Sequence, residues 1–380
     1  MTTAPQEWPR PAPPEALASA HAAGMRLTID LDALVRNWRR LAGRTAPAEC
    51  AAVVKADAYG IGVSHAVPPL VSAGCRTFFV ALPEEGARLR AFAPEAAIYV
   101  LNGFFPDAAA LFGGAALRPV LGHRTELEAW AARGGGPAAL HVDTGMNRLG
   151  FRPEEAEALP ADLVARAGID LVITHMACAD EPDHPLNAAQ LARFRALPAQ
   201  LSGVRRSLAN SAAIDLGRAY HFDLVRPGIA LYGGGCRPGG RSETVVTAEA
   251  RILQVRAAPA GETVGYGATE KLARDTRIAI LSAGYADGYP RSAGRGALPP
   301  AAVAIGGRAV PILGRISMDL IAADITGLPS GAIRPGDWAE LFGPTIPIDE
   351  AAAASGTIAY ELLTGLSRRA ARRHLGGEGG

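Results

Sequence analysis

The chain has 380 residues, 49% of them hydrophobic, which is enough to bury a substantial core and to build two domains. Its 38 Lys and Arg residues nearly balance its 37 Asp and Glu residues, and no basic run is interleaved with aromatic residues. Nucleic acid and anionic membrane surfaces are therefore not expected as partners, and no apolar run reaches the ~18 residues of a membrane span.

The four cysteines, Cys50, Cys75, Cys178 and Cys236, are scattered without CxxC spacing. This pattern favours reduced thiols over a disulfide framework or a metal site, and no metal is expected. The first 24 residues contain several prolines and lack the apolar segment of a secretory signal. We therefore expect residues 1–24 to form a flexible extension, and the protein to be cytoplasmic.

Between residues 25 and 240, short apolar runs alternate with segments whose apolar residues have helical spacing, such as 83–92, 124–134 and 186–197. Eight strands separated by helices predict an α/β fold in which a parallel sheet closes into a (β/α)8 barrel, the TIM-barrel architecture. The eight strand candidates are residues 50–54, 77–82, 96–101, 118–121, 138–143, 170–174, 204–209 and 223–226.

The pattern changes after residue 240, because strand-like runs now follow one another without helices between them. This predicts a C-terminal, mostly-β domain over residues 241–373, whose Ala-rich end from residue 348 onward favours one or two helices. Residues 374–380 are glycine-rich and are expected to form a flexible tail.

Lys55 directly follows the first strand of the predicted barrel. Burying an unpaired ammonium group costs several kcal/mol, so this side chain must leave the interior at the strand end. In parallel barrels the ligand site lies at the C-terminal ends of the strands. A partly desolvated lysine there has a lowered pKa and can attack a carbonyl to form a Schiff base. A solvated loop lysine is the alternative interpretation.

The residues around Lys55, VVKADAYGIG, resemble the pyridoxal-phosphate signature of the alanine racemases. The likeness continues in the family's order from about residue 25 to residue 373. It implies a racemase that interconverts L-alanine and D-alanine by two-base proton transfer on a pyridoxal-phosphate aldimine, and so supplies D-alanine for peptidoglycan. The further matching motifs are DTGMNRLGF, THMACADE, ANSAA, VRPGIALYG, VGYG, GYADGY, GRISMD and GTIAYE.

Racemisation requires one base on each face of a planar carbanion, because a single group cannot reach both sides. By resemblance, Lys55 holds the cofactor and removes the proton of the D isomer, while Tyr266 removes that of the L isomer. In the family this tyrosine comes from the C-terminal domain of the partner subunit. The resemblance therefore implies a head-to-tail homodimer with shared active sites.

The resemblance also implies which residues bind the cofactor. A dianionic phosphate needs hydroxyl and backbone N–H donors. The residues implied around the phosphate are Tyr59, Asn210, Ser211, Gly228, Ile229 and Tyr360, and those around the ring are Arg148, His175 and Arg226. These residues also have ordinary structural interpretations, such as a turn for Asn210 and Ser211 or a salt bridge for Arg148.

Arg226 is implied to face the pyridine nitrogen of the cofactor. Arginine stays protonated and can only donate hydrogen bonds, so the ring nitrogen would remain without its own proton. Such a ring is a weaker electron sink, which would favour proton exchange at Cα over transamination.

For the substrate, the resemblance implies that Arg148 helps to hold the carboxylate. The backbone N–H of Met318, beside Asp319, would bind that carboxylate from the partner subunit. Tyr285 and Tyr360 would narrow the entrance, so that alanine is accepted and larger side chains are rejected.

Three positions depart from the family pattern, and one of them, Ser317 in place of the usual cysteine, has little mechanistic weight. His141 stands where many relatives have a lysine that can be carbamylated and that orients the arginine matching Arg148. Ser207 stands where many relatives have a histidine that hydrogen-bonds the arginine matching Arg226. The sequence leaves open what orients the two arginines here.

Three other functions compete with this interpretation. The first is a racemase of broader specificity, acting on serine or other amino acids, whose periplasmic members tend to carry a signal peptide that is not seen in residues 1–24. A fold-related amino-acid decarboxylase would carry a glutamate opposite the pyridine nitrogen, where this chain has Arg226. A cofactor-carrying barrel protein without catalysis would lack the β-rich domain and Tyr266.

Overall fold

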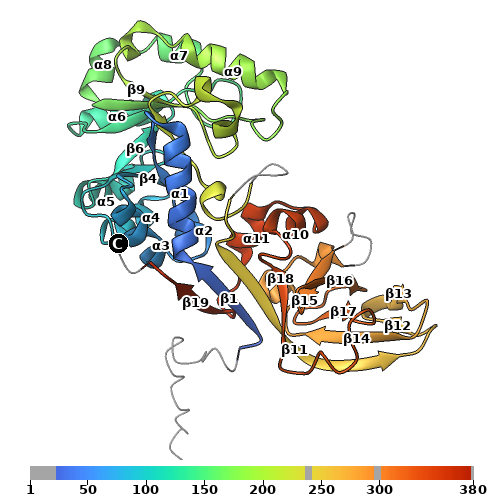
Figure 1. Cartoon of the computed structure of the whole chain (residues 1–380). Coiled ribbons are helices and arrows are strands. Elements are labelled where there is room, and N and C mark those ends of the chain that lie inside the picture. The colour runs from blue at the N-terminus through green and yellow to red at the C-terminus, as the bar shows by residue number, and fades with distance from the viewer. Residues whose placement is uncertain (1–22, 236–241, 295–300, 378–380) are drawn as a thin grey trace, which may run out of the picture. The chain divides into compact units, whose positions relative to one another are not determined.

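The computed structural model describes residues 23–235, 242–294 and 301–377 (Figure 1). The chain divides into two compact units, which we name by their main feature. Among the described residues, the barrel unit comprises 29–235, 242–246, 347–365 and 374–377, and the β unit comprises 23–28, 247–294, 301–346 and 366–373. Cys236 and nearly all of the predicted N-terminal extension lie outside the described residues.

The barrel unit is built around parallel strands that close into a ring. Strands β3 to β9 form one parallel seven-stranded sheet in chain order. Strand β10 links the two ends of this sheet. On one side it pairs with β2, and on the other side the N–H of Arg226, just after β10, donates to the carbonyl of Ala209, just after β9, at 2.9 Å. Because β2 runs into β3, eight strand positions close the ring, which confirms the predicted (β/α)8 barrel. The strands are β2 (Glu49–Cys50), β3 (Ala52–Val53), β4 (Thr77–Val80), β5 (Ala97–Val100), β6 (Arg118–Leu121), β7 (Ala138–His141), β8 (Ile169–Ile173), β9 (Arg205–Ser207) and β10 (Leu224–Val225).

Helices alternate with these strands, as the sequence pattern predicted. In α1, Asp30 caps the first turn by accepting the N–H of Ala33 at 2.8 Å, and Leu34, Trp38 and Leu41 recur on the buried face. The helices of this unit are α1 (Leu31–Thr45), α2 (Lys55–Tyr59), α3 (Val63–Ala73), α4 (Pro83–Arg90), α5 (Ala109–Gly114), α6 (Arg124–Ala132), α7 (Pro153–Glu157), α8 (Ala161–Arg166), α9 (Pro185–Arg195), α10 (Ile348–Ala354) and α11 (Ala359–Gly365).

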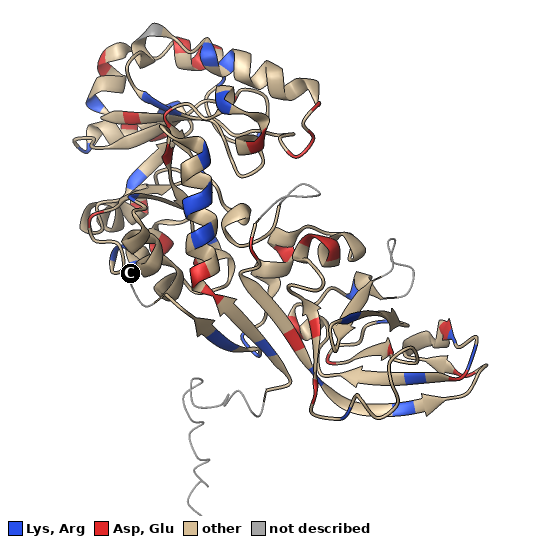
Figure 2. Cartoon of the chain, viewed as in Figure 1, with Lys and Arg blue, Asp and Glu red and all other residues tan. Residues whose placement is uncertain are grey.

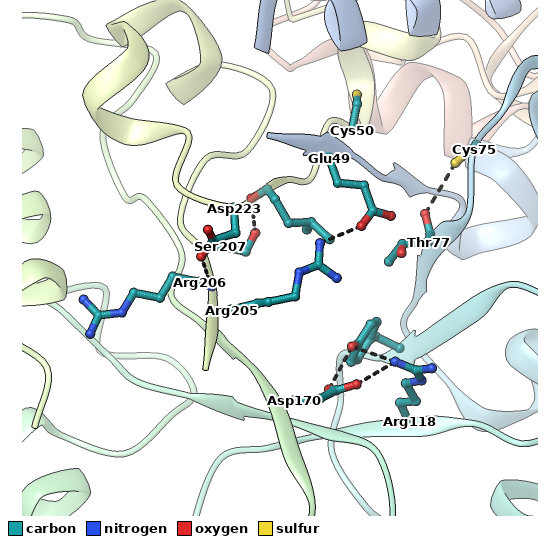
Figure 3. A network of polar contacts seen from close by, with 12 residues as sticks. Glu49, Cys50, Cys75, Thr77, Arg118, Asp170, Arg205, Arg206, Ser207 and Asp223 are labelled. Atoms are coloured by element: carbon teal, nitrogen blue, oxygen red, sulfur yellow. Dashed lines mark hydrogen bonds and ion pairs between the residues drawn. The ribbon is translucent and has the colours of Figure 1, made fainter. Parts of the chain in front are cut away.

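A polar layer lies at the N-terminal ends of the barrel strands (Figure 3). Arg205, at the start of β9, pairs with Glu49 of β2 at 2.6 Å, and Arg118, at the start of β6, pairs with Asp170 of β8 at 2.6 Å. Tyr99 donates its hydroxyl hydrogen to the same Asp170 carboxylate at 2.9 Å. Each of these charges has an opposite charge beside it, as expected at the end of a barrel that serves stability rather than chemistry.

The β unit is built around a second, antiparallel barrel. Six strands pair in the cyclic order β11, β14, β17, β16, β15, β18 and back to β11. Closure leaves no unpaired edge in this ring, and the mostly-β prediction for this part of the chain is confirmed. The strands of this unit, with those that extend its sheet, are β1 (Met25–Asp30), β11 (Val246–Ala258), β12 (Thr263–Val264), β13 (Glu270–Lys271), β14 (Thr276–Leu281), β15 (Ala302–Ile305), β16 (Arg308–Leu313), β17 (Ile321–Asp324), β18 (Trp338–Phe342) and β19 (Ala371–Leu375).

The two units differ in places from the predicted domain boundaries. α10 and α11, expected at the end of the C-terminal domain, belong to the barrel unit. The backbone of α11 lies close to the segment after Lys55, because a Cβ placed on Gly60 would be 2.7 Å from the carbonyl oxygen of Leu363. The chain is also structured beyond residue 373, where the tail was expected to begin. β19 runs to Leu375, and the N–H of Gly377 donates to Asp32 at 3.1 Å.

Charged residues of both signs are interspersed over each unit (Figure 2). In the described part of the chain, no helix has the length and apolar character needed to cross a membrane. No group of three or more His, Cys, Asp or Glu residues is placed there to hold a metal ion. Cys50, Cys75 and Cys178 are free thiols.

Candidate active site

A cavity of about 760 Å³ opens at the C-terminal ends of the barrel strands. All of its lining residues belong to the barrel unit. They come from the loops that follow several different strands and from α10 and α11, so residues distant in sequence meet here. The predicted residues among them are Lys55, Arg148, His175, Asn210 and Tyr360, and His141 lies there too.

Lys55 enters this cavity from an unusual piece of backbone. The turn α2 is left-handed, because Ala56, Asp57, Ala58 and Tyr59 all have φ between 53° and 55°. A left-handed conformation costs an L-residue roughly 1–2 kcal/mol, so four in succession persist only where the surroundings fix them. Within the turn, the N–H of Ala58 donates to the carbonyl of Val54 at 2.9 Å.

The surroundings of Lys55 shift its equilibrium toward the neutral amine. Burial lowers the pKa of its ammonium group, the positive charge of Arg148 lowers it further, and the negative charge of Glu85 opposes both. A lysine whose pKa is lowered in this way is suited to attack a carbonyl and to exchange protons, as the sequence predicted.

Arg226 is buried, with 4% of its surface exposed, and its hydrogen-bond partners are neutral oxygens. One terminal nitrogen donates to the carbonyl of Ser207 at 2.8 Å and to the Ser207 hydroxyl at 2.5 Å, and the other donates to the carbonyl of Thr174 at 2.5 Å. Burial lowers its pKa to about 10, so the guanidinium is still protonated at pH 7. A positive charge is therefore fixed in the barrel mouth by neutral groups.

Ser207 stands where the family resemblance leads us to expect a histidine. Its hydroxyl donates to the buried carbonyl of Leu224 at 2.6 Å and is therefore oriented to accept from Arg226. A small hydroxyl, itself held by the neighbouring strand, thus orients the arginine in this chain.

His141 and His175 lie beside these positive charges. Burial lowers the pKa of His175 to about 3 and that of His141 to about 4, and the charges of Arg226 and Arg148 act in the same direction. Both imidazoles are therefore neutral at pH 7.

Arg148 sits on a loop that folds back onto its own strand. The N–H of Phe151 donates to the carbonyl of His141 at 2.8 Å, and the Asp143 carboxylate accepts the N–H groups of Gly145 and Met146, each at 2.8 Å. A Cβ on Gly150 would lie 2.9 Å from the nitrogen of Asp143, so only glycine permits this closure. A backbone hydrogen bond and the Asp143 carboxylate thus fix the loop, with His141 in the place where the resemblance implies a lysine.

The residues expected at the phosphate form a compact group near β10. Ser211 Oγ accepts the N–H of Gly228 at 2.9 Å and that of Ala230 at 3.3 Å, so its own hydrogen is available to another acceptor. A Cβ on Gly228 would overlap the hydroxyl oxygen of Tyr59, so a larger residue would displace that phenol. The Tyr59 ring stacks on Tyr232 at 4.5 Å, which holds it in place. Ile229 begins the short helix η6 (Ile229–Leu231) that follows.

The remaining predicted residues lie in the β unit. Tyr266, in the short helix η7 (Tyr266–Ala268), is 70% exposed, and it lines a pocket of about 450 Å³ together with Arg315 and Leu320. Tyr285 and Met318 are also exposed. Their backbone segments are neighbours, because the N–H of Tyr285 donates to the carbonyl of Ser317 at 3.2 Å and that of Ala286 to the carbonyl of Met318 at 3.0 Å. Asp319 pairs with Arg369 at 2.9 Å.

Comparison with known proteins agrees with this geometry. Residues 29–235 match the N-terminal domain of alanine racemase, and residues 245–374 match its C-terminal domain. The chain belongs to the alanine racemase family. An alanine racemase of Rhizobium meliloti is 50% identical over 94% of this chain and 98% of its own length, and a biosynthetic alanine racemase of Agrobacterium fabrum is 48% identical over 93% and 94%.

A solved structure supports the same assignment. The crystal structure of alanine racemase from Bartonella henselae with covalently bound pyridoxal phosphate matches with a TM-score of 0.86 and 40% identity, covering 93% of this chain and all of that one. The family and the two-part fold expected from the sequence motifs are thereby confirmed.

Two side chains that hold the alanine racemase site together were missed by sequence reasoning. Gln190 of α9 is fully buried and donates to Thr144 Oγ1 at 3.1 Å and to the carbonyl of His175 at 2.9 Å, while its oxygen accepts the N–H of Ala177 at 2.9 Å. Glu85 of α4 accepts the N–H of Ala56 at 2.7 Å. Neither sequence segment carries a signal for this role, because both have ordinary helical spacing.

Proposed function

We propose that this chain is an alanine racemase that interconverts L-alanine and D-alanine with pyridoxal phosphate as cofactor. The proposal is carried by two observations at the C-terminal ends of the barrel strands. Lys55 lines the cavity there with a lowered pKa, and Arg226, which follows β10, is held by neutral oxygens. The Rhizobium meliloti relative and the pyridoxal phosphate bound covalently in the Bartonella henselae enzyme support it.

The residues present fit the proposed cofactor. Lys55 offers an amine for its aldehyde, and the free hydroxyl hydrogen of Ser211 offers a donor to a phosphate oxygen. Burial raises the pKa of Tyr59 and raises that of Tyr360 to about 12, so both phenols keep the protons that a phosphate would accept. When bound, pyridoxal phosphate supplies an electron-withdrawing ring that acidifies the Cα–H of an attached amino acid.

Four side chains of the protein would then each have a separate role in the reaction. Arg226 can only donate, so it keeps a ring nitrogen as an acceptor and limits electron withdrawal, which favours proton exchange over transamination. Arg148 lines the cavity and would bind the substrate carboxylate. Lys55 Nζ would hold the proton on one face of Cα, and Tyr266 Oη would hold it on the other.

We propose that the two bases come from different chains of a head-to-tail homodimer. Tyr266, Tyr285, Met318 and Leu320 are exposed large side chains of one unit, and such surfaces usually mark an interface. The backbone N–H of Met318, beside Asp319, and the ring of Tyr285 would then reach the partner's substrate.

Subunit mixing tests this sharing. Lys55→Ala and Tyr266→Ala are each expected to be inactive, whereas refolding them together produces heterodimers with one intact site. About a quarter of wild-type activity is expected from random pairing, because half of the dimers are mixed and each has one good site of two. Were both bases supplied by one chain, the mixture would stay as inactive as its parents.

The reaction itself is tested with purified protein and L-alanine in deuterated water. Optical rotation should vanish while deuterium enters Cα, and Tyr266→Ala should keep the absorbance of bound pyridoxal phosphate but lose turnover of L-alanine. Release of carbon dioxide would favour a decarboxylase, and exchange without formation of D-alanine would exclude the two-base mechanism. Faster turnover of L-serine than of L-alanine would favour a racemase of broader specificity.

We further propose that the enzyme is cytoplasmic and supplies D-alanine for peptidoglycan. The free thiols Cys50, Cys75 and Cys178 support a reducing compartment. Cell fractionation tests the location, and a requirement for external D-alanine after deletion of the gene tests the role.

A further inference from the structure

The left-handed turn at residues 56–59 is a feature that the proposed reaction does not by itself explain. Each of its four residues carries a Cβ and adopts a conformation that ordinarily suits glycine. The turn immediately follows Lys55, so its handedness sets the direction in which that side chain leaves β3. Something in the surrounding structure must favour it over a right-handed turn.

The Glu85 carboxylate is the side chain that bonds the start of this turn. Its Oε1 accepts the N–H of Ala56 at 2.7 Å, and its Oε2 accepts the N–H groups of Ala81 at 2.8 Å and Leu82 at 3.2 Å. Hydrogen bonds to an ionised carboxylate are about twice as strong as those between neutral groups. One carboxylate therefore joins the residue after Lys55 to the end of β4 and the start of α4.

We propose that Glu85 is a positioning residue that fixes the left-handed turn and so directs Lys55 into the cavity, an inference that rests on the proposed cofactor function. The competing explanation is that Glu85 only caps α4 through Ala81 and Leu82. The two explanations differ in one hydrogen bond, because only the positioning role requires the bond between Glu85 and the N–H of Ala56. The negative charge of Glu85 also offsets part of the effect of burial and Arg148 on Lys55.

Glu85→Gln is the direct test, since glutamine cannot accept on both sides with its single oxygen. Its matched control is Glu84→Gln, which removes the same charge from the neighbouring, exposed position on α4. We expect bound pyridoxal phosphate to dissociate at least tenfold faster from Glu85→Gln, and backbone amides at 55–60 to exchange with deuterium at least tenfold faster. The turnover number should fall with little change in KM, and Glu84→Gln should match the wild type.

A second substitution separates the turn from the cap. Ala56→Gly relieves the strain of a positive φ without touching α4, so the double variant Glu85→Gln, Ala56→Gly should regain most of the cofactor retention and amide protection. The same recovery is expected if Glu85→Gln alone folds poorly. Were the double variant no better than Glu85→Gln, or were Glu85→Gln indistinguishable from Glu84→Gln, Glu85 would be a helix cap only. A wild type that binds no pyridoxal phosphate would instead overturn the proposed function.

Discussion

The two ends of the barrel differ in whether their positively charged side chains form ion pairs. At the N-terminal ends of the strands, Arg205 and Arg118 each lie against a carboxylate. At the C-terminal ends, Lys55, Arg148 and Arg226 take part in none of the ion pairs found among the described residues. A paired charge holds neighbouring strands together, whereas an uncompensated one retains its field for a ligand.

The uncompensated end carries a cost that the structure limits with hydrogen bonds. Arg226 is buried but is surrounded by the oxygens of Ser207 and Thr174, which satisfy its donors without cancelling its charge. Burial keeps His141 and His175 neutral, and the positive charges of Arg226 and Arg148 reinforce this. Four predictions test this contrast between the ends, from the largest expected effect to the smallest.

Removing the lysine at the mouth should abolish function while leaving the fold intact. Lys55→Ala is expected to lose the absorbance of bound pyridoxal phosphate and at least about 10⁴-fold in activity, the upper range for one acid–base group. Arg205→Ala, at the opposite end, is the control and should keep both. Measurable racemisation of alanine by Lys55→Ala at more than about a hundredth of the wild-type rate would contradict the assignment.

Acid should destabilise the protein through His141 and His175, the two neutral histidines of the site. Their pKa values in the folded protein, about 4 for His141 and about 3 for His175, lie below the value of about 6.5 in the unfolded chain. At a pH between the folded and unfolded values, the unfolded chain therefore binds more protons than the folded protein. Stability is thus complete above pH 6.5 and falls as the pH drops toward 4, by up to about 1.4 kcal/mol per pH unit for each histidine.

Urea denaturation at pH 7 and pH 5 measures this loss. His141→Gln and His175→Gln should each show a smaller pH dependence than the wild type, whereas the exposed His123→Gln should not. If His141→Gln and His175→Gln both kept the wild-type pH dependence of the free energy of unfolding, the two histidines would be protonated in the folded protein.

The hydroxyl that orients Arg226 should matter for both stability and turnover. Ser207→Ala removes one partner of Arg226 and leaves the buried carbonyl of Leu224 unpaired, which should lower the free energy of unfolding by about 1–3 kcal/mol. The turnover number should fall as well. Ser202→Ala, in an exposed loop, provides the control for stability, and equal effects of the two substitutions would contradict the role given to Ser207.

The smallest effect is expected at the paired end of the barrel. A double-mutant cycle on Glu49→Gln and Arg205→Gln should give a coupling of about 0–1 kcal/mol, because both side chains are partly exposed to water. Racemase activity should stay unchanged in all three variants. A clear loss of activity would mean that the two ends of the barrel are functionally coupled.

The sequence was informative wherever the function of a residue depends on its neighbours in the chain. All eight predicted barrel strands are present, because buried parallel strands require apolar runs that can be recognised one at a time. Lys55 was predicted at the barrel mouth from the strand before it, and the family was predicted from motifs in a fixed order. The roles of Tyr266, Met318 and Asp319 remain predictions, since they depend on a second chain.

Some features could not be predicted, because they depend on contacts between segments far apart in sequence. Glu85 and Gln190 have the spacing of ordinary helical residues, and only folding brings their side chains to the loops of the site. The position of α11 beside Gly60 was missed for the same reason.

The sequence by itself determined the two-part architecture, the lysine at the mouth of the barrel and the family. These follow from local hydrophobic pattern and from short motifs. Only the tertiary structure decided how the charges of the site are held: Ser207 for Arg226, a self-pairing loop for Arg148, and Glu85 for the turn after Lys55. The bonds of Ser207 and Glu85 join segments distant in the chain, and those of the Arg148 loop join residues within ten positions of one another. Neither kind of bond leaves a periodic pattern in the residues that make it.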